Sequence, residues 1–346
     1  MFQVESMFNM GDIERFSFPA AIISRTPNIL LVGMDIGAMG FKKFVDGSNS
    51  IFHFEKILGD DGHLCVNPWW YVVGNEFWED RLKIISQVYG DRKHTHAHIL
   101  CNCPTEVKYV REKFGIHALL LNQNIFVHEE NFIVDRKEII FDAVYNAKIA
   151  WFKRHWLAAE LKNLALIYSS YSDSEEYYNF IRATLPNAAF LNGHPFLTEY
   201  RKFTGPEICS IINKSKVGLC LSEVEGAMYS SVEYLLCGLP VVSTHNTGGR
   251  NETFGEEYCR IVDDNVGAIA MAVEELISLK FNPHEIRLKT LAKISHGRKN
   301  FVDFVNNIKI CNGSQPDGAD ALVSIMKPDW AVWVWKSIGD LRTDFQ

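Results

Sequence analysis

Apolar runs and amphipathic runs alternate along most of this chain, and the alternation constrains its fold more than any other feature. In the N-terminal part, the apolar run at 29–32 is followed by a segment with helical periodicity at 75–90. In the C-terminal part, apolar runs at 164–170 and 217–222 are separated by amphipathic segments such as 174–186. Strands that alternate with helices form parallel sheets with both faces covered. We therefore predict an α/β protein with parallel sheets.

The chain is long enough for two such sheets. Its 346 residues exceed one ordinary core and fit two domains of common size. We take the charged segment 128–138 as the linker, and predict a short N-terminal domain at 1–135 and a second domain at 136–326. A C-terminal helix at 327–346, rich in tryptophan, is expected to dock on the first domain rather than enter a membrane interface.

Two segments are expected to lack strands. Residues before 27 are predicted to form an irregular arm, and 153–163 is predicted to be a helix, the first of the second series.

The charge of the chain excludes some classes of protein. The net charge of −7 argues against a general nucleic-acid binder, which needs clustered cations. Acidic residues (Glu5, Asp12 and Glu14) stand where a signal peptide is basic, and no apolar run reaches the ~18 residues of a membrane span. We predict a cytoplasmic protein without an integral membrane segment.

The cysteines do not predict a metal site. Several of the eight lie inside apolar segments, as small core residues do. Cys101 and Cys103 form a C-x-C without a second ligand pair, so we expect reduced thiols and no bound metal.

The glycines after the first strand do not form a dinucleotide fingerprint. Gly33, Gly37 and Gly40 miss the G-x-G-x-x-G spacing, which disfavours an NAD-dependent oxidoreductase. Their spacing still allows a close approach of the backbone to a ligand, and we take Gly37 as a candidate in a ligand-facing loop of the first domain.

Two glutamates eight residues apart point to a ligand site. Glu225 follows an apolar run and lies in a loop, and Glu233 lies in the helix that begins after it. The backbone N–H groups at the start of that helix, from Ala227 to Ser230, favour phosphate oxygens. Glu225 is then placed to accept hydrogen bonds from sugar hydroxyls, and Glu233 from a ribose hydroxyl pair. By spacing alone, both glutamates could also be solvated helix residues.

The same segment resembles the E-x7-E signature of the retaining, nucleotide-sugar-dependent glycosyltransferases of family 4, which have the GT-B fold of two Rossmann-like domains facing across a cleft. The matching residues are Glu225, Gly226, Glu233, Cys237, Gly238, Pro240, Val241, Val242, Gly248, Gly249 and Glu252. The chain departs from the family at Ala227 and Met228, where an aromatic residue and a second glycine are usual.

The resemblance also implies two cations on the donor diphosphate. Lys153 aligns with the family lysine, Arg154 replaces the glycine that follows it, and Lys148 or Asn146 stands where the family has arginine. We predict Lys148, Lys153 and Glu225 as catalytic residues. A surface charge run is the alternative for Lys153 and Arg154.

Further resemblance extends the expected site. The segment 188–196 resembles the strand and loop that face the nucleotide base, and 101–126 resembles the segment that closes the first domain, with Asn124 near the loop between the domains. The histidines His53, His63 and His98 are candidates for lining the donor pocket. The expected donor-binding residues are Arg154, Asn192, Gly193, His194, Gly226, Ala227, Met228, Tyr229, Ser230 and Glu233.

The resemblance implies a hexosyltransferase that uses a nucleotide-sugar and retains the anomeric configuration without a metal or other cofactor. The expected donor is a UDP- or GDP-sugar. The acceptor is expected to be a small molecule, a glycan or a lipid-linked compound. One alternative stays open, a GT-B protein that binds a nucleotide or sugar without transferring it.

Overall fold

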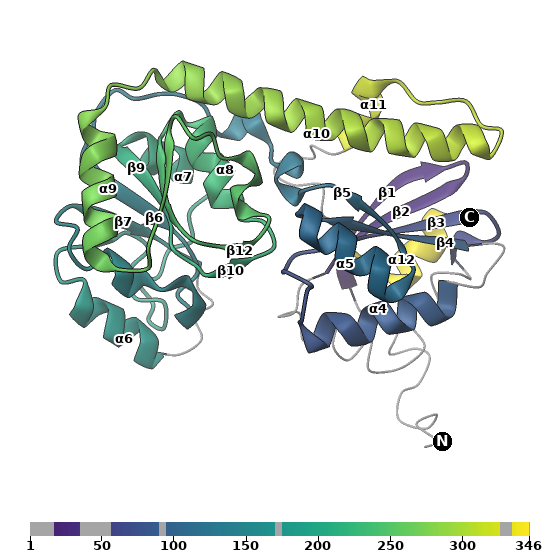
Figure 1. Cartoon of the computed structure of the whole chain (residues 1–346), viewed down its shortest axis with the longest axis horizontal. Helices are drawn as coiled ribbons and strands as arrows, with labels where there is room; N and C mark the ends of the chain where they lie inside the picture. Colours follow the sequence, from purple (N-terminus) through teal and green to yellow (C-terminus); the bar gives the residue numbers. More distant parts are fainter. Residues whose placement is uncertain (1–16, 35–56, 90–94, 170–174, 326–333, 346) are drawn as a thin grey trace. The chain divides into compact units, whose positions relative to one another are not determined.

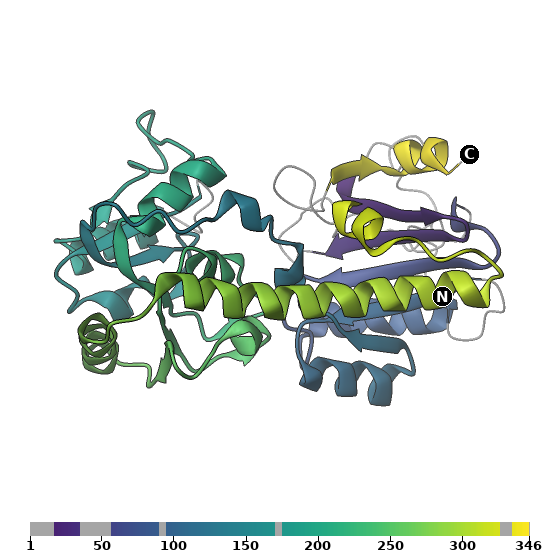
Figure 2. The same cartoon turned by 90° about the horizontal axis from the view of Figure 1, so that it is seen from above.

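The chain folds into two compact units. The computed structural model describes residues 17–34, 57–89, 95–169, 175–325 and 334–345. Unit 1 consists of Met1–Phe126 and His296–Gln346, and unit 2 of Val127–Ser295. The helix α10 (Pro283–Cys311) contributes to both units and is continuous in Figure 1 and Figure 2.

A six-stranded sheet forms the centre of unit 1, in the order β14-β1-β2-β3-β4-β5. Its strands are β1 (Ser17–Arg25), β2 (Asn28–Met34), β3 (Gly62–Pro68), β4 (Thr95–Cys101), β5 (His117–Leu120) and β14 (Val334–Ser337). The strands β2 to β5 are parallel, whereas β1 pairs antiparallel with both β2 and β14. The parallel strands are those that the alternation in the sequence favours.

Helices cover both faces of the unit 1 sheet. They are α4 (Glu76–Tyr89), α5 (Pro104–Phe114), α11 (Ala319–Ile325), α12 (Ile338–Asp344) and the C-terminal part of α10. Leu30 and Leu64 face a core shared with α4 and α5, while their neighbours Ile29 and Cys65 face a core shared with α10 and α11. Successive residues of a strand point to opposite faces, so each strand supplies both cores. Figure 1 shows α4 and α5 on one side of this sheet and α10 on the other.

The helix α5 begins and ends where its sequence indicates. Pro104 occupies its first turn, where a missing N–H costs nothing. Gly115 follows its last residue with φ +67°, and its N–H donates to Arg111 O.

The unit 2 sheet is parallel throughout and has the order β13-β11-β9-β6-β7-β8. Its strands are β6 (Phe141–Asn146), β7 (Leu164–Ile167), β8 (Ala189–Phe190), β9 (Ser215–Cys220), β11 (Val241–Thr244) and β13 (Cys259–Val262). The chain proceeds outward from β6 to β8, returns to β9 beside β6, and proceeds outward again. This is the strand order of doubly wound Rossmann-type sheets, with the topological switch point between β6 and β9.

Four helices and the first part of α10 pack on this sheet around a single hydrophobic core. The helices are α6 (Glu175–Thr184), α7 (Gly205–Asn213), α8 (Tyr229–Leu236) and α9 (Val266–Ser278). Figure 1 shows α9 on one side of the sheet and α7 and α8 on the other. The loops at the carboxyl ends of the strands are therefore held between two helical layers.

Three segments differ from the expectation. The arm expected before residue 27 contains the strand β1, which pairs with β2. The helix expected at 153–163 is replaced by two 3-10 turns, η3 (Trp151–Lys153) and η4 (His155–Ala158), because Arg154 between them has a left-handed backbone with φ +51°. Part of the helix expected at 327–346 is the strand β14, which extends the sheet beyond β1.

The segment 128–138, expected to be a linker, packs on unit 2. Asp135 N–H donates to Asn213 Oδ1 at 2.8 Å, and Arg136 Nη2 donates to Ser215 O at 2.9 Å. The unit boundaries at 126/127 and 295/296 lie N-terminal to those expected at 135 and 326. The acceptor and donor roles of the two domains stay a prediction.

The longest helix, α10, has 29 residues and is charged along its length. Arg298 in it is buried and donates to Ile125 O at 2.8 Å. None of the helices in the described ranges combines the length and the apolar run that a bilayer crossing needs.

Candidate functional site

Two loops flank the switch point of the unit 2 sheet. One follows β6, which ends at Asn146, and the other follows β9, which ends at Cys220. The first loop carries Lys148 and Lys153, and the second carries Glu225. In doubly wound sheets, ligands bind beyond the carboxyl ends of the strands at this point. The three residues predicted to be catalytic thus come from the two loops that the topology favours.

Lys153 is held with its side chain inside the protein. Only 8% of the residue is exposed, and its carbonyl accepts a 2.6 Å hydrogen bond from Tyr145 Oη. Its ammonium lies 5.0 Å from the centroid of the Phe152 ring. Lys148 lies two residues after β6 and is half-buried. A lysine is rarely buried unless its charge is paired, so Lys153 requires a partner.

That partner is Glu225. Lys153 Nζ donates to Glu225 Oε1 in an ion pair whose two side chains are both largely buried. Ser222 Oγ donates to the same carboxylate oxygen at 2.6 Å. Removal of two charges from water costs several kcal/mol, which only close pairing and further hydrogen bonds offset. The protein therefore holds opposite charges in close contact at the edge of the sheet where a ligand is expected.

The Gly-Gly segment positions the backbone of Glu225. The two-residue strands β10 (Val224–Glu225) and β12 (Thr247–Gly248) pair in parallel, and Gly249 N–H donates to Gly226 O at 2.6 Å. Gly248 has φ +125°, and a Cβ there would lie 1.7 Å from Glu225 O. Only glycine allows both that backbone conformation and that approach.

Asn146, at the end of β6, ties this strand to the beginning of α8. Its N–H donates to Tyr234 Oη at 2.6 Å, its carbonyl accepts from Ser230 Oγ at 2.7 Å, and its side-chain amide donates to Glu233 Oε2 at 3.1 Å. Burial raises the pKa of Glu233 to about 7, against the opposing effect of the Asn146 hydrogen bond. Glu233 thus changes charge near neutral pH.

The two residues that depart from the family pattern are buried. Ala227 is 5% and Met228 4% exposed, and the Met228 side chain packs in the unit 2 core together with Tyr229. Met228 is also the N-cap of α8 and has no side-chain hydrogen bond to cap it. The Met228 carbonyl accepts from Ser231 Oγ at 2.6 Å. Ala227 and Met228, which differ from the family pattern, are therefore buried side chains next to the first residue of α8.

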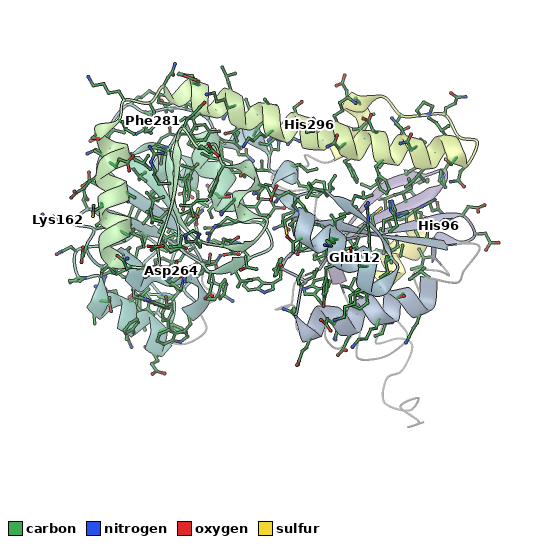
Figure 3. The ribbon with its side chains drawn as sticks, in the orientation of Figure 1. His96, Glu112, Lys162, Asp264, Phe281 and His296 are labelled. Carbon is green, nitrogen blue, oxygen red and sulfur yellow. The ribbon has the colours of Figure 1, made fainter. Side chains whose placement is uncertain are left out.

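Arg154 connects the carboxyl ends of three strands. Its guanidinium donates to Leu221 O at 2.7 Å after β9, to Thr244 Oγ1 at 2.9 Å in β11, and to Asp264 Oδ2 at 2.6 Å after β13. Asp264 is labelled in Figure 3. We predict Arg154 to bind the donor. In the structure its guanidinium donates its hydrogen bonds to acceptors within the protein.

Arg250, which the sequence reasoning did not single out, lies beneath the same loops. It is fully buried and donates to Ser222 O at 2.6 Å, to Ser243 Oγ at 2.8 Å and to Thr244 O at 2.7 Å. Burial lowers the pKa of this arginine. Its position directly after the Gly-Gly motif was the available signal.

The segment 192–194 forms a tight loop after β8. Asn192 is buried, accepts from Tyr168 N–H at 2.8 Å and donates to Arg201 O at 2.7 Å. Gly193 has φ +76°, and the His194 ring lies 4.4 Å from the Tyr178 ring. The Asn192 side chain thus maintains the shape of this loop.

The remaining candidates belong to unit 1. Asn124 is 1% exposed, and neither polar atom of its side-chain amide has a hydrogen-bond partner among the described residues. Gly37 lies outside the described residues. The structure does not place either of them at the unit 2 site.

The candidate histidines form a chain inside the unit 1 sheet. His63 Nδ1 lies 2.9 Å from His98 Nε2, and His98 Nδ1 lies 2.8 Å from His117 Nδ1. Burial lowers the pKa of His63 to about 4 and that of His98 to about 2. His63 and His98 lie within β3 and β4 rather than beyond their carboxyl ends, and His53 falls outside the described residues.

Metal ligands are not gathered in the part of the chain that the structure describes. Within it, no three or more His, Cys, Asp or Glu side chains form a group that could hold a metal ion. Cys101 and Cys103 are both buried, and neither forms a disulfide.

No protein-family model and no curated protein sequence matches this chain. Solved structures match at low identity. Sucrose-phosphate synthase from Thermosynechococcus elongatus is 13% identical with a TM-score of 0.54, over 85% of this chain and 78% of that one. Pneumococcal O-GlcNAc transferase GtfA, solved with UDP and GlcNAc, is 13% identical with a TM-score of 0.53, over 80% of this chain and 56% of that one.

A third structure, the N-terminal domain of Candida albicans trehalose-6-phosphate phosphatase, is 12% identical with a TM-score of 0.52, over 80% of this chain and 78% of that one. Likeness at such identities concerns the fold. The predicted α/β architecture of the GT-B type is thereby confirmed.

Proposed function

We propose that the chain transfers a sugar from a nucleotide-sugar to an acceptor, and that the donor binds at the switch point of unit 2. The buried pair of Lys153 and Glu225 carries this proposal. Buried ion pairs contribute little net stability, so their presence calls for another role. A pair at the carboxyl edge between β6 and β9, the preferred ligand position of the fold, supports a role in binding a charged, hydroxyl-bearing ligand.

A nucleotide-sugar offers a partner to each member of the pair. Its diphosphate attracts the Lys153 ammonium in charge-assisted hydrogen bonds, and the sugar hydroxyls donate to the Glu225 carboxylate. The start of α8, where Met228 provides no side-chain cap, supplies a positive helix end to the same anion. Donor binding therefore exchanges one internal ion pair for two contacts with the ligand.

The nucleoside is assigned to the region near Glu233. Glu233 lies in the second turn of α8, where the Asn146 amide donates a hydrogen bond to its carboxyl. The two adjacent hydroxyls of a ribose can both donate hydrogen bonds to the Glu233 carboxylate. These hydrogen bonds would replace those that the carboxylate loses when it is removed from water. The base, uracil or guanine of the expected UDP- or GDP-sugar, is assigned to the loop at 192–194.

In the reaction, the bond between the anomeric carbon and the diphosphate oxygen breaks, and the acceptor oxygen bonds to that carbon on the same face. The leaving phosphate takes the proton of the acceptor hydroxyl. The charge that develops on the phosphate is stabilised by Lys153, with Lys148 as the second cation of the loop. These side chains supply the electrostatic stabilisation without requiring a carboxylate pair of the glycosidase kind.

A second candidate function is binding of a nucleotide or sugar without transfer. Two observations favour it. Arg154, which stands where the family has glycine, donates to Leu221, Thr244 and Asp264 rather than facing outward. One of the similar structures belongs to a protein named as a phosphatase, so the fold alone does not determine the reaction.

A donor panel separates the two functions. The full chain is mixed with UDP-, GDP-, ADP-, CMP- and dTDP-sugars, and both the thermal shift and the release of nucleotide are measured with and without sugar and lipid acceptors. Transfer predicts a shift and release with one donor, each abolished by Lys153→Met. A shift without release across the panel supports the second function, and the absence of any shift contradicts both.

A further inference from the structure

Two thiols meet between α7 and the end of α8. Cys209 lies in α7, and Cys237 is the residue that caps the C-terminus of α8. Their sulfur atoms are 3.8 Å apart and in hydrogen-bond contact. A disulfide requires the two sulfur atoms to approach from this distance to ~2.05 Å.

One of the two thiols, Cys209, is 7% exposed and lines a pocket. Cys209 lines a surface pocket of about 450 Å³ that also includes Ile133, Asn213 and Lys214. Cys237, by contrast, is fully buried. A small molecule in the pocket can therefore reach Cys209 first, and Cys237 only through Cys209.

The surroundings of Cys209 favour its thiolate. With Cys209 ionised, the Cys237 thiol and the Asn213 side-chain amide (3.4 Å) both donate hydrogen bonds to its sulfur. The Cys237 hydrogen bond lowers the pKa of Cys209 to about 7, whereas burial raises that of Cys237. In thiol–disulfide exchange the thiol with the lowered pKa is the attacking group, and here that thiol lies at the wall of a pocket.

The other buried cysteines of unit 2 lack these features. Burial raises the pKa of both Cys220 and Cys259 to about 12. The exposed thiol, Cys311, lies in the part of α10 that belongs to unit 1.

We propose that Cys209 and Cys237 form a reversible disulfide by exchange with a small oxidised disulfide of the glutathione type. The Cys209 thiolate attacks one sulfur of the oxidant, forms a mixed disulfide and releases one thiol. The Cys237 sulfur, as its proton leaves, attacks the Cys209 sulfur and releases the second thiol. Two protein thiols are oxidised by two electrons, and one disulfide oxidant is reduced to two thiols.

The disulfide acts on the helix that carries Glu233. Cys237 N–H donates to Glu233 O at 3.1 Å, and Arg287 Nη1 holds the neighbouring Leu236 O at 2.8 Å. A covalent bond from α7 to Cys237 therefore restrains the last turn of α8. Formation of the bond is independent of the proposed transferase activity, and its effect on donor binding rests on that activity.

The test uses the full chain with Cys311→Ser, which removes the exposed thiol. The protein is equilibrated with oxidised glutathione, quenched with acid, alkylated and analysed by intact mass and peptide mapping. We expect the joint loss of two alkylatable thiols, a Cys209–Cys237 linked peptide, and reversal by dithiothreitol. A lasting glutathione adduct on Cys209 with Cys237 still alkylatable overturns the proposal, as does a pair in which both thiols stay reduced.

Single variants separate the two steps. In the same background, Cys237→Ser should stop at a glutathione adduct on Cys209, and Cys209→Ser should take up no glutathione at Cys237. Cys259→Ser, at a buried thiol of the same unit, serves as the matched control and should still form the link. If Cys237→Ser fails to fold, peptide mapping of the parent protein still shows whether Cys209 and Cys237 are linked.

Discussion

Lys153 and Glu225 form a buried ion pair that joins the loop after β6 to the loop after β9. The two residues are far apart in sequence and meet because β6 and β9 are neighbours at the switch point of the sheet. Ser222 Oγ donates to the Glu225 carboxylate, and the β10–β12 pairing fixes the backbone of Glu225. The fold therefore holds these two opposite charges in contact at the switch point of the unit 2 sheet.

Replacement of Lys153 alone should lower the free energy of unfolding more than replacement of Lys153 and Glu225 together. Lys153→Met leaves the Glu225 carboxylate buried without its partner, which typically destabilises by about 3 kcal/mol or more. The double variant Lys153→Met, Glu225→Gln removes both charges and should regain most of that loss. Urea unfolding of the single and double variants measures the difference. An equal free energy of unfolding for the two variants would show that the pairing is not energetically coupled.

A surface pair provides the control for this experiment. Lys216 Nζ lies 2.7 Å from Asp142 Oδ1, and both side chains are more than one third exposed. Because exposed pairs contribute roughly 0–1 kcal/mol, Lys216→Met should change the free energy of unfolding by less than about 1 kcal/mol.

Glu233 should make the stability of unit 2 depend on pH. Its pKa is raised from 4.5 to about 7 in the folded protein. Between these values the folded state retains a proton that the unfolded state has lost, so the stabilising contribution is full below pH 4.5 and is lost as pH rises through 7. The unfolding free energy of the wild type, relative to Glu233→Gln, should fall across this window, by at most about 1.4 kcal/mol per pH unit.

The measurement is urea unfolding at a series of pH values from 4 to 8. Glu274→Gln, at an exposed position on α9, is the matched control and should run parallel to the wild type. A constant difference between wild type and Glu233→Gln over the window would contradict the assignment of a buried, protonatable carboxyl.

Gly248→Ala should disrupt the site through the backbone. The new Cβ would lie 1.7 Å from Glu225 O, at a residue with φ +125°, so β10 and β12 must separate. We expect a loss of about 3 kcal/mol in the free energy of unfolding and at least tenfold weaker donor binding by titration calorimetry. Gly313→Ala has a positive φ but no atom within 4 Å of the new Cβ, and should lose only about 1–2 kcal/mol. Similar losses in the free energy of unfolding for Gly248→Ala and Gly313→Ala would contradict a destabilising contact between the new Cβ and Glu225 O.

The sequence predicted those parts of the fold and the site that short stretches specify. Each of three elements can be recognised from its own stretch of sequence: the apolar runs of β6 and β9, and the amphipathic helix α8. Glu225 and Glu233 lie eight residues apart within one such stretch. The parallel order of the unit 2 sheet follows from the alternation of such runs.

What the sequence did not predict depends on partners distant in the chain. Arg250 is buried because carbonyls at the ends of β9 and β11 converge on it, and its position after Gly248 and Gly249 is the one sign of this in its own stretch of sequence. The run at 153–163 has helical periodicity, yet Leu157 and Ala158 reach the core from a 3-10 turn. The interruption lies in the backbone of Arg154, a residue type that does not itself indicate a left-handed conformation.

Arg154 therefore gives a sharp test of that backbone. Arg154→Ala and Arg154→Gly lose the same guanidinium contacts with Leu221, Thr244 and Asp264. They differ in the cost of the left-handed conformation at φ +51°, roughly 1–2 kcal/mol for a residue with a Cβ and almost none for glycine. We expect Arg154→Gly to be more stable than Arg154→Ala in urea unfolding, whereas at most positions the alanine variant is the more stable. At Arg182 in the helix α6, Ala should instead be more stable than Gly by about 1 kcal/mol. If Ala is the more stable residue at both positions, Arg154 does not adopt the left-handed backbone, and the continuous helix expected at 153–163 is restored as the better description.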